Sequence, residues 1–227
     1  MIEINELFMG NQFDKAVNMK LVPGLPSYDF FINELVLRQG IADFVGVHLA
    51  AKKDTTIRFH RINHLESSSR ILSLLKYRSG RSENYLKTKA NYTADTFRRG
   101  ISDLEKAGYV VRTHDLLFLG DYPDESKVKL WAFELKLSDW KRALFQALQY
   151  CSFADYSVIV FPQNKYHLLK RNITVFRLFK IGILLFDPVS LKSEWLIRPG
   201  KITKHAKFSR IYAINQVINR TYIRNEI

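Results

Sequence analysis

The stretch from Trp131 to Leu137 constrains the fold more than any other part of the sequence. Its residues alternate in the way that is typical of a β-strand, whose side chains point to two faces in turn. One face would carry Trp131, Phe133, Leu135 and Leu137, and the other Glu134 and Lys136. The neighbouring segments have the composition of interior strands, where a charge is costly unless it is paired or bound to a metal. Glu134 and Lys136 are therefore candidate site residues, although a solvated outer face would give the same spacing.

The charge of the chain indicates an anionic partner. The 227 residues carry a formal net charge of +13, and a basic surface favours nucleic acid or an anionic membrane. No long amphipathic basic helix stands out as a membrane anchor, so nucleic acid is the favoured partner. A general solubility effect would explain the charge equally well.

Composition also bears on location. The longest apolar runs, 157–161 and 181–186, are far too short to span a bilayer. Residues 1–15 lack the apolar core that a signal peptide needs. The single cysteine, Cys151, excludes an internal disulfide and fits a reducing compartment. We therefore expect a cytoplasmic protein with no membrane partner.

The N-terminal part of the chain supplies further acids. We expect a helix over residues 28–39 that carries Glu34 and stops at Gly40. The next segment, 41–47, has the pattern of a strand on which Asp43 shares a face with apolar neighbours. An acid in that setting is a second candidate site residue, although a salt bridge beside a turn would also place it there. For Glu34, a solvated helix acid is an equally good interpretation.

Between residues 65 and 120 the pattern changes to three helices followed by a strand pair. The helices are expected over 65 to about 80, 83–89 and 94–107. The run from Asp103 to Val110 resembles the exit of a recognition helix into the wing of a winged helix-turn-helix domain. This resemblance implies that the third helix lies in the major groove of DNA, where arginine pairs with guanine edges and phosphates. Its outer side would carry Asp95, Thr96, Arg98, Arg99 and Ser102. A module used only for packing or dimerisation would show the same pattern.

The remaining segments alternate between strands and helices. A helix from Asp139 to about Cys151 would place Gln146 and Tyr150 together beside its core face. The other elements are expected as strands over 55–62, 156–161, 181–186 and 194–198, a helix over 164–179, and a helical basic tail over 201–224.

In this order the segments resemble the PD-(D/E)xK nuclease superfamily, which includes restriction endonucleases and Holliday-junction-resolvase-like enzymes. The matches are Gly40-Ile41-Ala42-Asp43 for the first acid, Glu134-Leu135-Lys136 for the (D/E)xK element, and Gln146-Ala147-Leu148-Gln149-Tyr150 for the QxxxY element of some branches. The chain departs from the motif at Ala42, where its name calls for proline.

The resemblance covers residues 27–62 and 116 to about 198. It implies an α/β fold of the restriction-endonuclease-like type, with a mixed central sheet flanked by helices. The nuclease-like core would comprise residues 1–62 and 116–227, and a winged helix-turn-helix domain would be inserted at 63–115.

The resemblance also implies a Mg²⁺ site, in which Mn²⁺ could substitute. Hydrolysis of a phosphodiester needs a neutralised phosphate and a nucleophilic water, and Mg²⁺ held by one or two carboxylates suits both needs. Asp43 and Glu134 would bind the ion with the backbone carbonyl of Leu135. Glu34 would hold a metal-bound water or a second ion.

Other residues would act around the ion. Lys136 would orient or help to deprotonate the attacking water and offset developing negative charge. Gln146 would position Lys136 or the phosphate, and Tyr150 would contact the DNA backbone. For Gln146 and Tyr150, a purely structural role is the simpler interpretation.

These features favour a metal-dependent DNA endonuclease whose winged helix grips duplex DNA, and many nucleases of this type act as homodimers. A non-catalytic DNA-binding regulator or recombination accessory protein on a nuclease-like scaffold is the alternative, and an RNA-processing nuclease is a third. Scattered histidines and one cysteine do not complete a structural zinc site. The sequence contains neither a Gly-x-x-x-x-Gly-Lys phosphate loop nor a Gly-x-Ser-x-Gly elbow.

Overall fold

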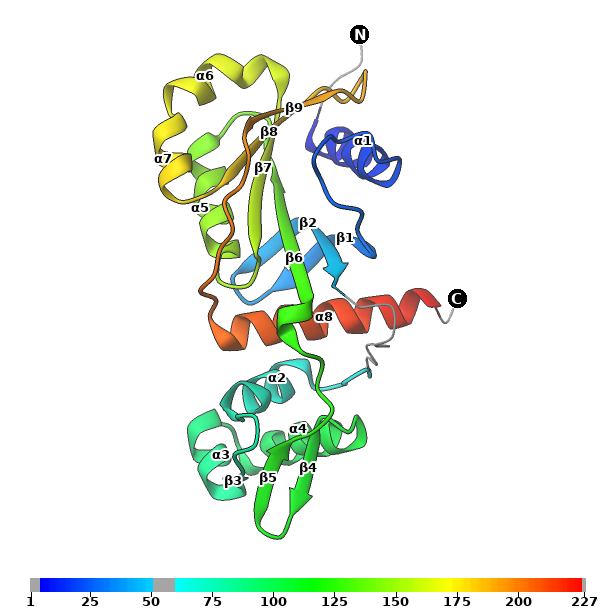
Figure 1. The fold of residues 1–227 in the computed structure, drawn as a ribbon, viewed down its shortest axis with the longest axis vertical. Helices are drawn as coiled ribbons and strands as arrows, with labels where there is room; N and C mark the ends of the chain where they lie inside the picture. Colours follow the sequence, from blue (N-terminus) through cyan, green and yellow to red (C-terminus); the bar gives the residue numbers. More distant parts are fainter. Residues whose placement is uncertain (1–4, 51–59, 226–227) are drawn as a thin grey trace. The chain divides into compact units, whose positions relative to one another are not determined.

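The computed structural model describes residues 5–50 and 60–225. The chain forms two compact units, each built from separate stretches of sequence (Figure 1). Unit 1 comprises Met1–Leu49 and Lys129–His205, and unit 2 comprises Ala50–Val128 and Ala206–Ile227. Within the described residues, no helix has the length and apolar character needed to cross a membrane.

Unit 1 is built on a mixed six-stranded sheet, in the order β1-β2-β6-β7-β8-β9. The strands are β1 Phe30–Leu37, β2 Gly40–Leu49, β6 Val128–Leu135, β7 Tyr156–Pro162, β8 Gly182–Phe186 and β9 Ser193–Ile197. The central strands β6, β7 and β8 are parallel, and antiparallel pairs (β1 with β2, β8 with β9) form the two edges. The expected α/β fold with a mixed sheet flanked by helices is therefore confirmed.

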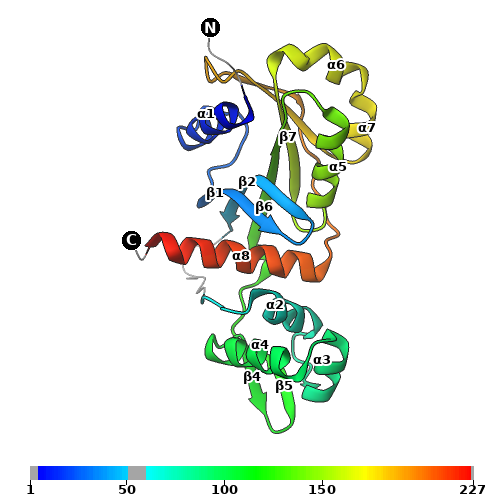
Figure 2. The ribbon, with the colours of Figure 1, turned by 180° about the vertical axis from the view of Figure 1, so that it is seen from behind.

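Helices cover both faces of this sheet (Figures 1 and 2). They are α1 Glu6–Asn18 on one face and α5 Trp140–Tyr150, α6 Tyr166–Arg171 and α7 Ile173–Leu178 on the other, with a 3₁₀ turn at Gln163–Lys165. Alternation along β7 explains the two layers: Val158 and Val160 pack in the cluster of α1, and Ile159 and Phe161 in that of α5 to α7. The single helix expected over 164–179 is in fact two short ones.

The prediction of a helix over 28–39 is wrong, because this segment contains strand β1. It forms a hairpin with β2 in which Leu37 pairs with Gly40. Gly40, with a φ of 138°, closes the hairpin turn instead of ending a helix. Glu34 has a φ of 51°, which is rare for a non-glycine residue inside a strand. This backbone kink leaves Ile32 and Leu35 buried three residues apart, and that spacing imitates a helix.

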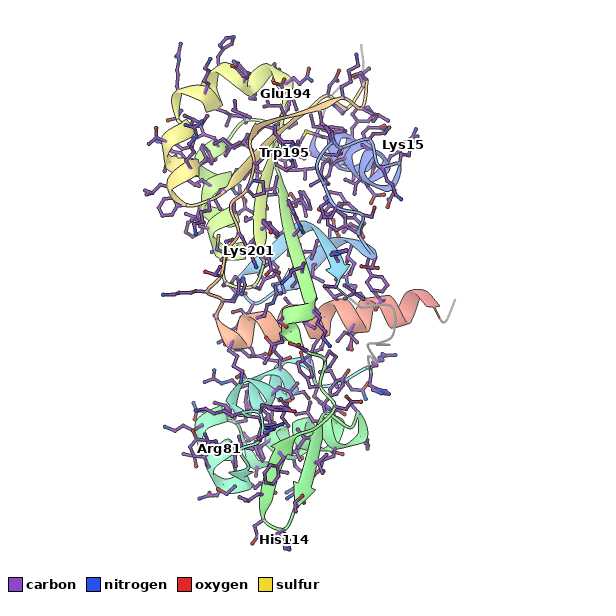
Figure 3. All side chains as sticks on the ribbon, viewed as in Figure 1. Lys15, Arg81, His114, Glu194, Trp195 and Lys201 are labelled. Atoms are coloured by element: carbon purple, nitrogen blue, oxygen red, sulfur yellow. The ribbon has the colours of Figure 1, made fainter. Side chains whose placement is uncertain are left out.

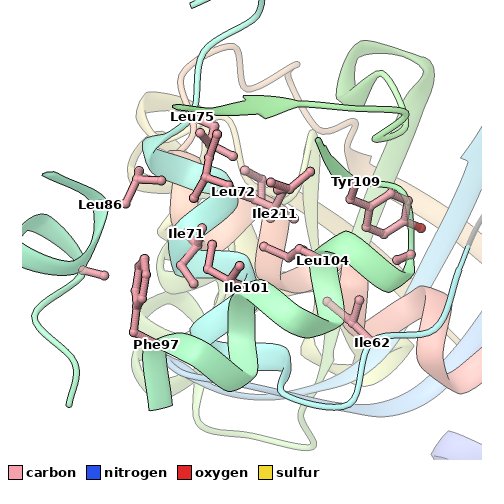
Figure 4. Packing of buried hydrophobic residues seen from close by; sticks show 14 residues of the cluster. Ile62, Ile71, Leu72, Leu75, Leu86, Phe97, Ile101, Leu104, Tyr109 and Ile211 are labelled. Carbon is pink, nitrogen blue, oxygen red and sulfur yellow. The ribbon is translucent and has the colours of Figure 1, made fainter. Parts of the chain in front are cut away.

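Unit 2 combines helices with a three-stranded sheet in the order β3-β5-β4. Its elements are α2 Leu65–Leu74, β3 Arg81–Ser82, α3 Glu83–Ala90, α4 Ala94–Lys106, β4 Val110–Thr113, β5 Leu116–Leu119, a 3₁₀ turn at Glu125–Lys127, and α8 Lys207–Asn225. Phe97, Ile101 and Leu104 follow one another at helical spacing on α4, and all three lie in the core shown in Figure 4. Of the strand expected over 55–62, residues 55–59 lie outside the described residues, and residues 60–62 are not in a strand.

The C-terminal helix α8 belongs to unit 2, whereas the sequence interpretation had assigned it to the nuclease-like core. Its apolar residue Ile211 joins the unit 2 core. The side-chain amide of Asn219 also pairs with both backbone groups of Ile62, donating to the carbonyl at 2.6 Å and accepting from the N–H at 3.2 Å. The boundaries of unit 2 are thus wider than the expected 63–115.

Candidate active site

The site in unit 1 centres on Glu134, at the C-terminal end of β6. Its side chain is 0% exposed, and one carboxylate oxygen lies in a short hydrogen bond with the hydroxyl of Tyr150 on α5. The same hydroxyl is 2.8 Å from the carbonyl oxygen of Ile41 on β2. Burial and the neighbouring carboxylate together raise the pKa of Tyr150, so the phenol keeps its proton. Tyr150 therefore ties β6 to β2 through the buried acid.

Lys136 follows β6 directly and brings a positive charge to this acid. Its ammonium Nζ lies 2.8 Å from Oε1 of Glu134, donates to the backbone carbonyl of Leu135 at 3.1 Å, and lies 3.8 Å from Glu6. Oε1 of Glu134 is buried and, among the described residues, makes no hydrogen bond. The 2.8 Å contact with Lys136 is therefore a close ion pair at the buried end of the acid.

Burial and charge act in opposite directions on this pair. Burial and the nearby Asp43 raise the pKa of Glu134, and Lys136 and Tyr150 only partly offset this. Burial would lower the pKa of Lys136, but the surrounding carboxylates outweigh it and the pKa is raised. The two directions are compatible because the ammonium faces several carboxylates, whereas Glu134 faces one ammonium and another acid.

Asp43 on β2 supplies the second carboxylate. Its Oδ2 accepts a hydrogen bond of 2.7 Å from the backbone N–H of Leu135, which fixes the side chain beside Glu134. Burial raises the pKa of Asp43, and the Leu135 hydrogen bond and the Lys136 charge oppose the rise. The structure thus brings together the three residues Asp43, Glu134 and Lys136, as the sequence predicted.

A pocket opens next to Asp43. It has a volume of about 300 Å³ and is lined from α1 by Glu6, Leu7, Gly10 and Asn11, from the hairpin by Asn33, Glu34, Asp43 and Phe44, and from β6 by Leu135. Glu34 reaches this pocket from β1, where it lies between the pairs Asn33–Phe44 and Leu35–Ala42 of the hairpin. The charges of Glu6 and Glu34 both add to the raised pKa of Asp43.

Sequence reasoning missed Glu6. Its helix α1 has two recognisable signals: Asn5 is an N-cap whose side chain accepts from the N–H of Phe8 at 2.8 Å, and Met9, Phe13 and Ala16 form a buried helical stripe. These signals predict a helix whose first residue is an acid.

Two predicted site residues have other surroundings than expected. Tyr150 is 1% exposed, which places it against Glu134 and not on a surface that DNA reaches. Gln146 has a buried side-chain oxygen with no hydrogen-bond partner among the described residues, and no described contact joins it to Lys136. Both residues lie on α5, on the side of the sheet where Glu134 is buried.

The donor set fits Mg²⁺ in kind. Asp43, Glu134 and the carbonyl of Leu135 offer the hard oxygen ligands that this ion prefers, and Mg²⁺ commonly uses only one or two carboxylates while keeping several waters. In the described part of the chain, however, no group of three or more acidic, histidine or cysteine side chains lies close enough to hold a metal ion. The Lys136 ammonium contacts Glu134 and the Leu135 carbonyl, so an ion bound to both would take the place of this ammonium.

The predicted DNA-binding residues other than Tyr150 lie on α4 in unit 2. Arg98 and Arg99 are exposed, and Thr96 and Ser102 are half-buried. Arg99 forms an ion pair of 2.8 Å with Asp95, and Arg98 lies 3.9 Å from the same acid. The outer face of α4 therefore carries arginines whose charge is partly balanced within the helix.

Comparison of the sequence with protein-family models finds no match, and comparison with curated proteins finds none either.

Proposed function

We propose that the chain is a metal-dependent nuclease that hydrolyses phosphodiester bonds in DNA. The observation that carries the proposal is the hydrogen bond from the Leu135 N–H to Asp43, which holds this acid beside Glu134 and Lys136 at the edge of a pocket. The resemblance to the PD-(D/E)xK nucleases, on the same three residues, supports it.

The site residues divide the chemistry between them. A bound Mg²⁺ or Mn²⁺ would neutralise phosphate charge and lower the pKa of a coordinated water. Asp43, Glu134 and the Leu135 carbonyl would hold it, and Tyr150 would fix the Glu134 carboxylate. Once released from Glu134, the Lys136 ammonium would orient the attacking water and offset negative charge on the phosphate.

Glu34 and Glu6 would act at the pocket. Both carboxylates line it beside Asp43, where they would hold a metal-bound water or a second ion. Of the two, Glu6 has the closer described link to the site, because it lies 3.8 Å from the Lys136 ammonium.

Unit 2 would bind duplex DNA as a winged helix. Its order of helix, strand, two helices and two strands, α2-β3-α3-α4-β4-β5, supports this proposal. Arg98 and Arg99 would contact base edges and phosphates in the major groove, with Thr96 and Ser102 beside them.

The test compares the loss of two acids at the site with the loss of an acid elsewhere in the same sheet. Wild-type protein and the Asp43→Asn and Glu134→Gln variants are incubated with plasmid DNA and Mg²⁺, and Glu194→Gln serves as the matched control. Glu194 is an exposed acid on β9, at the opposite edge of the sheet from β1 (Figure 3). We expect the two site variants to lose about a hundredfold or more of the nicking rate and the control to keep it. No nicking by the wild type, or equal nicking by all variants, contradicts the proposal.

A second candidate function has an observation of its own. The Lys136 ammonium lies against two of the three proposed metal ligands, as it would in a DNA-binding protein that has lost catalysis. Such a protein would bind DNA but show no Mn²⁺ binding that Glu134→Gln removes. Calorimetry with Mn²⁺ separates the two functions.

A further inference from the structure

The turn between α2 and α3 in unit 2 is short and fixed at both ends. Leu75, just after α2, accepts a hydrogen bond of 2.6 Å at its carbonyl from Lys207 of α8. A bridge between Lys76 and Ser79 closes the turn, and Arg78 adopts a left-handed backbone with a φ of 59°. Arg81 then enters β3 and pairs with β5. The side chains of this turn are therefore presented from a defined backbone.

Two aromatic rings project from this region beside arginines. Tyr77 is 73% exposed and Tyr85, at the start of α3, is 41% exposed. The guanidinium carbon of Arg78 lies 5.2 Å from the centre of the Tyr77 ring, and that of Arg81 lies 5.3 Å from the centre of the Tyr85 ring. Figure 3 labels Arg81 in unit 2. Each ring thus has a cation over it, an arrangement that holds the arginine without neutralising it.

The cations of this turn differ from the arginines of α4 and β4. Within the described residues, Lys76, Arg78 and Arg81 form no ion pair. By contrast, the arginines of α4 lie near Asp95, and Arg112 on β4 is paired with both Glu83 and Glu105 at 2.8 and 3.0 Å. Among the described residues, the turn therefore carries three cations outside any ion pair, whereas the arginine of the wing is paired.

We propose that this surface, defined as residues 76–81 with Tyr85, binds a nucleic-acid strand whose bases are unpaired. Phosphates would bind Lys76, Arg78 and Arg81, and bases would stack on the two tyrosines. Aromatic side chains stack on the faces of bases, which duplex nucleic acid keeps covered by neighbouring base pairs. The proposal rests on the proposed function only in taking nucleic acid as the ligand, and it does not require the site in unit 1 to cut.

The test measures binding without cleavage. Fluorescence anisotropy is recorded with labelled oligothymidylate and with a duplex of the same length, in EDTA, for the full-length protein. Tyr77→Ala should weaken binding of the single strand by about 5- to 150-fold, because a stacked base contributes about 1–3 kcal/mol. Tyr77→Phe keeps the ring and should stay within about twofold of the wild type. Arg78→Ala should reduce the slope of log affinity against log salt by about 0.7.

Two further variants separate this surface from the other proposals. Arg98→Ala on α4 should weaken duplex binding and leave single-strand binding intact. Glu134→Gln should abolish nicking and also leave single-strand binding intact. The proposal is overturned if the wild type does not bind the oligothymidylate, or if Tyr77→Ala binds it with the affinity of the wild type. It is also overturned if Tyr77→Ala loses the same factor in affinity for the duplex and for the single strand. Because Tyr77 is highly exposed, circular dichroism of the variant should match the wild type.

Discussion

Replacing Lys136 by methionine tests the electrostatics of the site without any assumption about catalysis. The substitution keeps most of the side-chain length and removes the charge that faces Glu134. At 2.8 Å, two unit charges attract by about 6 kcal/mol with an effective dielectric constant of about 20. Desolvation offsets much of this gross value, since the Lys136 side chain is only 13% exposed and Glu134 is fully buried. We expect a net loss of about 3 kcal/mol in the free energy of unfolding, because breaking a buried pair leaves one charge uncompensated.

A double-mutant cycle isolates the pair. Glu134→Gln can keep the hydrogen bond with Tyr150 and should cost about 1 kcal/mol. The double variant should lose about 2 kcal/mol and not the sum of about 4, because neither partner is then left charged alone. Urea unfolding followed by tryptophan fluorescence reports on unit 1 alone, since Trp131, Trp140 and Trp195 all belong to it. Additive losses, or a Lys136→Met variant within about 0.5 kcal/mol of the wild type, would refute this reasoning.

The cost of Lys136→Met should also depend on pH. The pKa of Glu134 is raised above its ordinary value of 4.5 by burial and by Asp43. At a pH between the ordinary pKa and the raised pKa of Glu134, the folded chain binds more protons than the unfolded chain. Glu134 therefore favours folding at low pH, and this contribution is lost as the pH rises through the raised pKa. Lys136→Met removes the positive charge that lowers the pKa of Glu134. The pKa of Glu134 in the folded variant is then higher still, and the pH range in which this group favours folding extends upward. The stability difference between variant and wild type should therefore shrink as the pH is lowered towards 4.5.

Three other predictions follow from described contacts. The Asp103 carboxylate accepts hydrogen bonds of 2.6 Å and 2.8 Å from the backbone N–H and the ring Nδ1 of His64. Asp103→Ala removes both bonds and should destabilise unit 2 by about 2 kcal/mol, measured by hydrogen exchange. Unchanged exchange in unit 2 would contradict this prediction. Tyr150→Phe leaves the buried Glu134 without its hydroxyl partner and should lower the stability of unit 1 by about 1–3 kcal/mol in urea unfolding. Lys136→Met removes a positive charge near the proposed metal ligands, so this variant should bind Mn²⁺ about tenfold more tightly than the wild type. Electron paramagnetic resonance measures the affinity. Weaker binding would show that the ammonium does not occupy the position of the metal.

The parts of the site that lie on regular strands could be predicted from the sequence. Alternation along β6 correctly separates Phe133 and Leu135, which pack in the α1 cluster, from Glu134, which faces α5. The same reasoning finds Asp43 on β2. In both strands successive side chains point to opposite faces, so a pattern of period two is enough to tell which residues share a face.

The parts that depend on backbone irregularity or distant contacts could not be predicted. The left-handed backbone of Glu34 breaks the alternation of β1, and no local pattern signals it. The assignment of α8 to unit 2 depends on contacts such as that between Asn219 and Ile62, which are 157 positions apart in the sequence. Amphipathic spacing predicts that such a helix exists but not which core it covers.

The pairing of Asn219 with Ile62 has a consequence for biosynthesis. Every strand of unit 1 precedes α8 in the sequence, yet the core of unit 2 is incomplete until α8 is present. Until then Ile71 and Leu72 on α2 lack the apolar contact that Ile211 provides. A chain under synthesis is therefore expected to carry an unfinished unit 2 until α8 emerges from the ribosome, and chaperone binding and aggregation compete with folding in this interval.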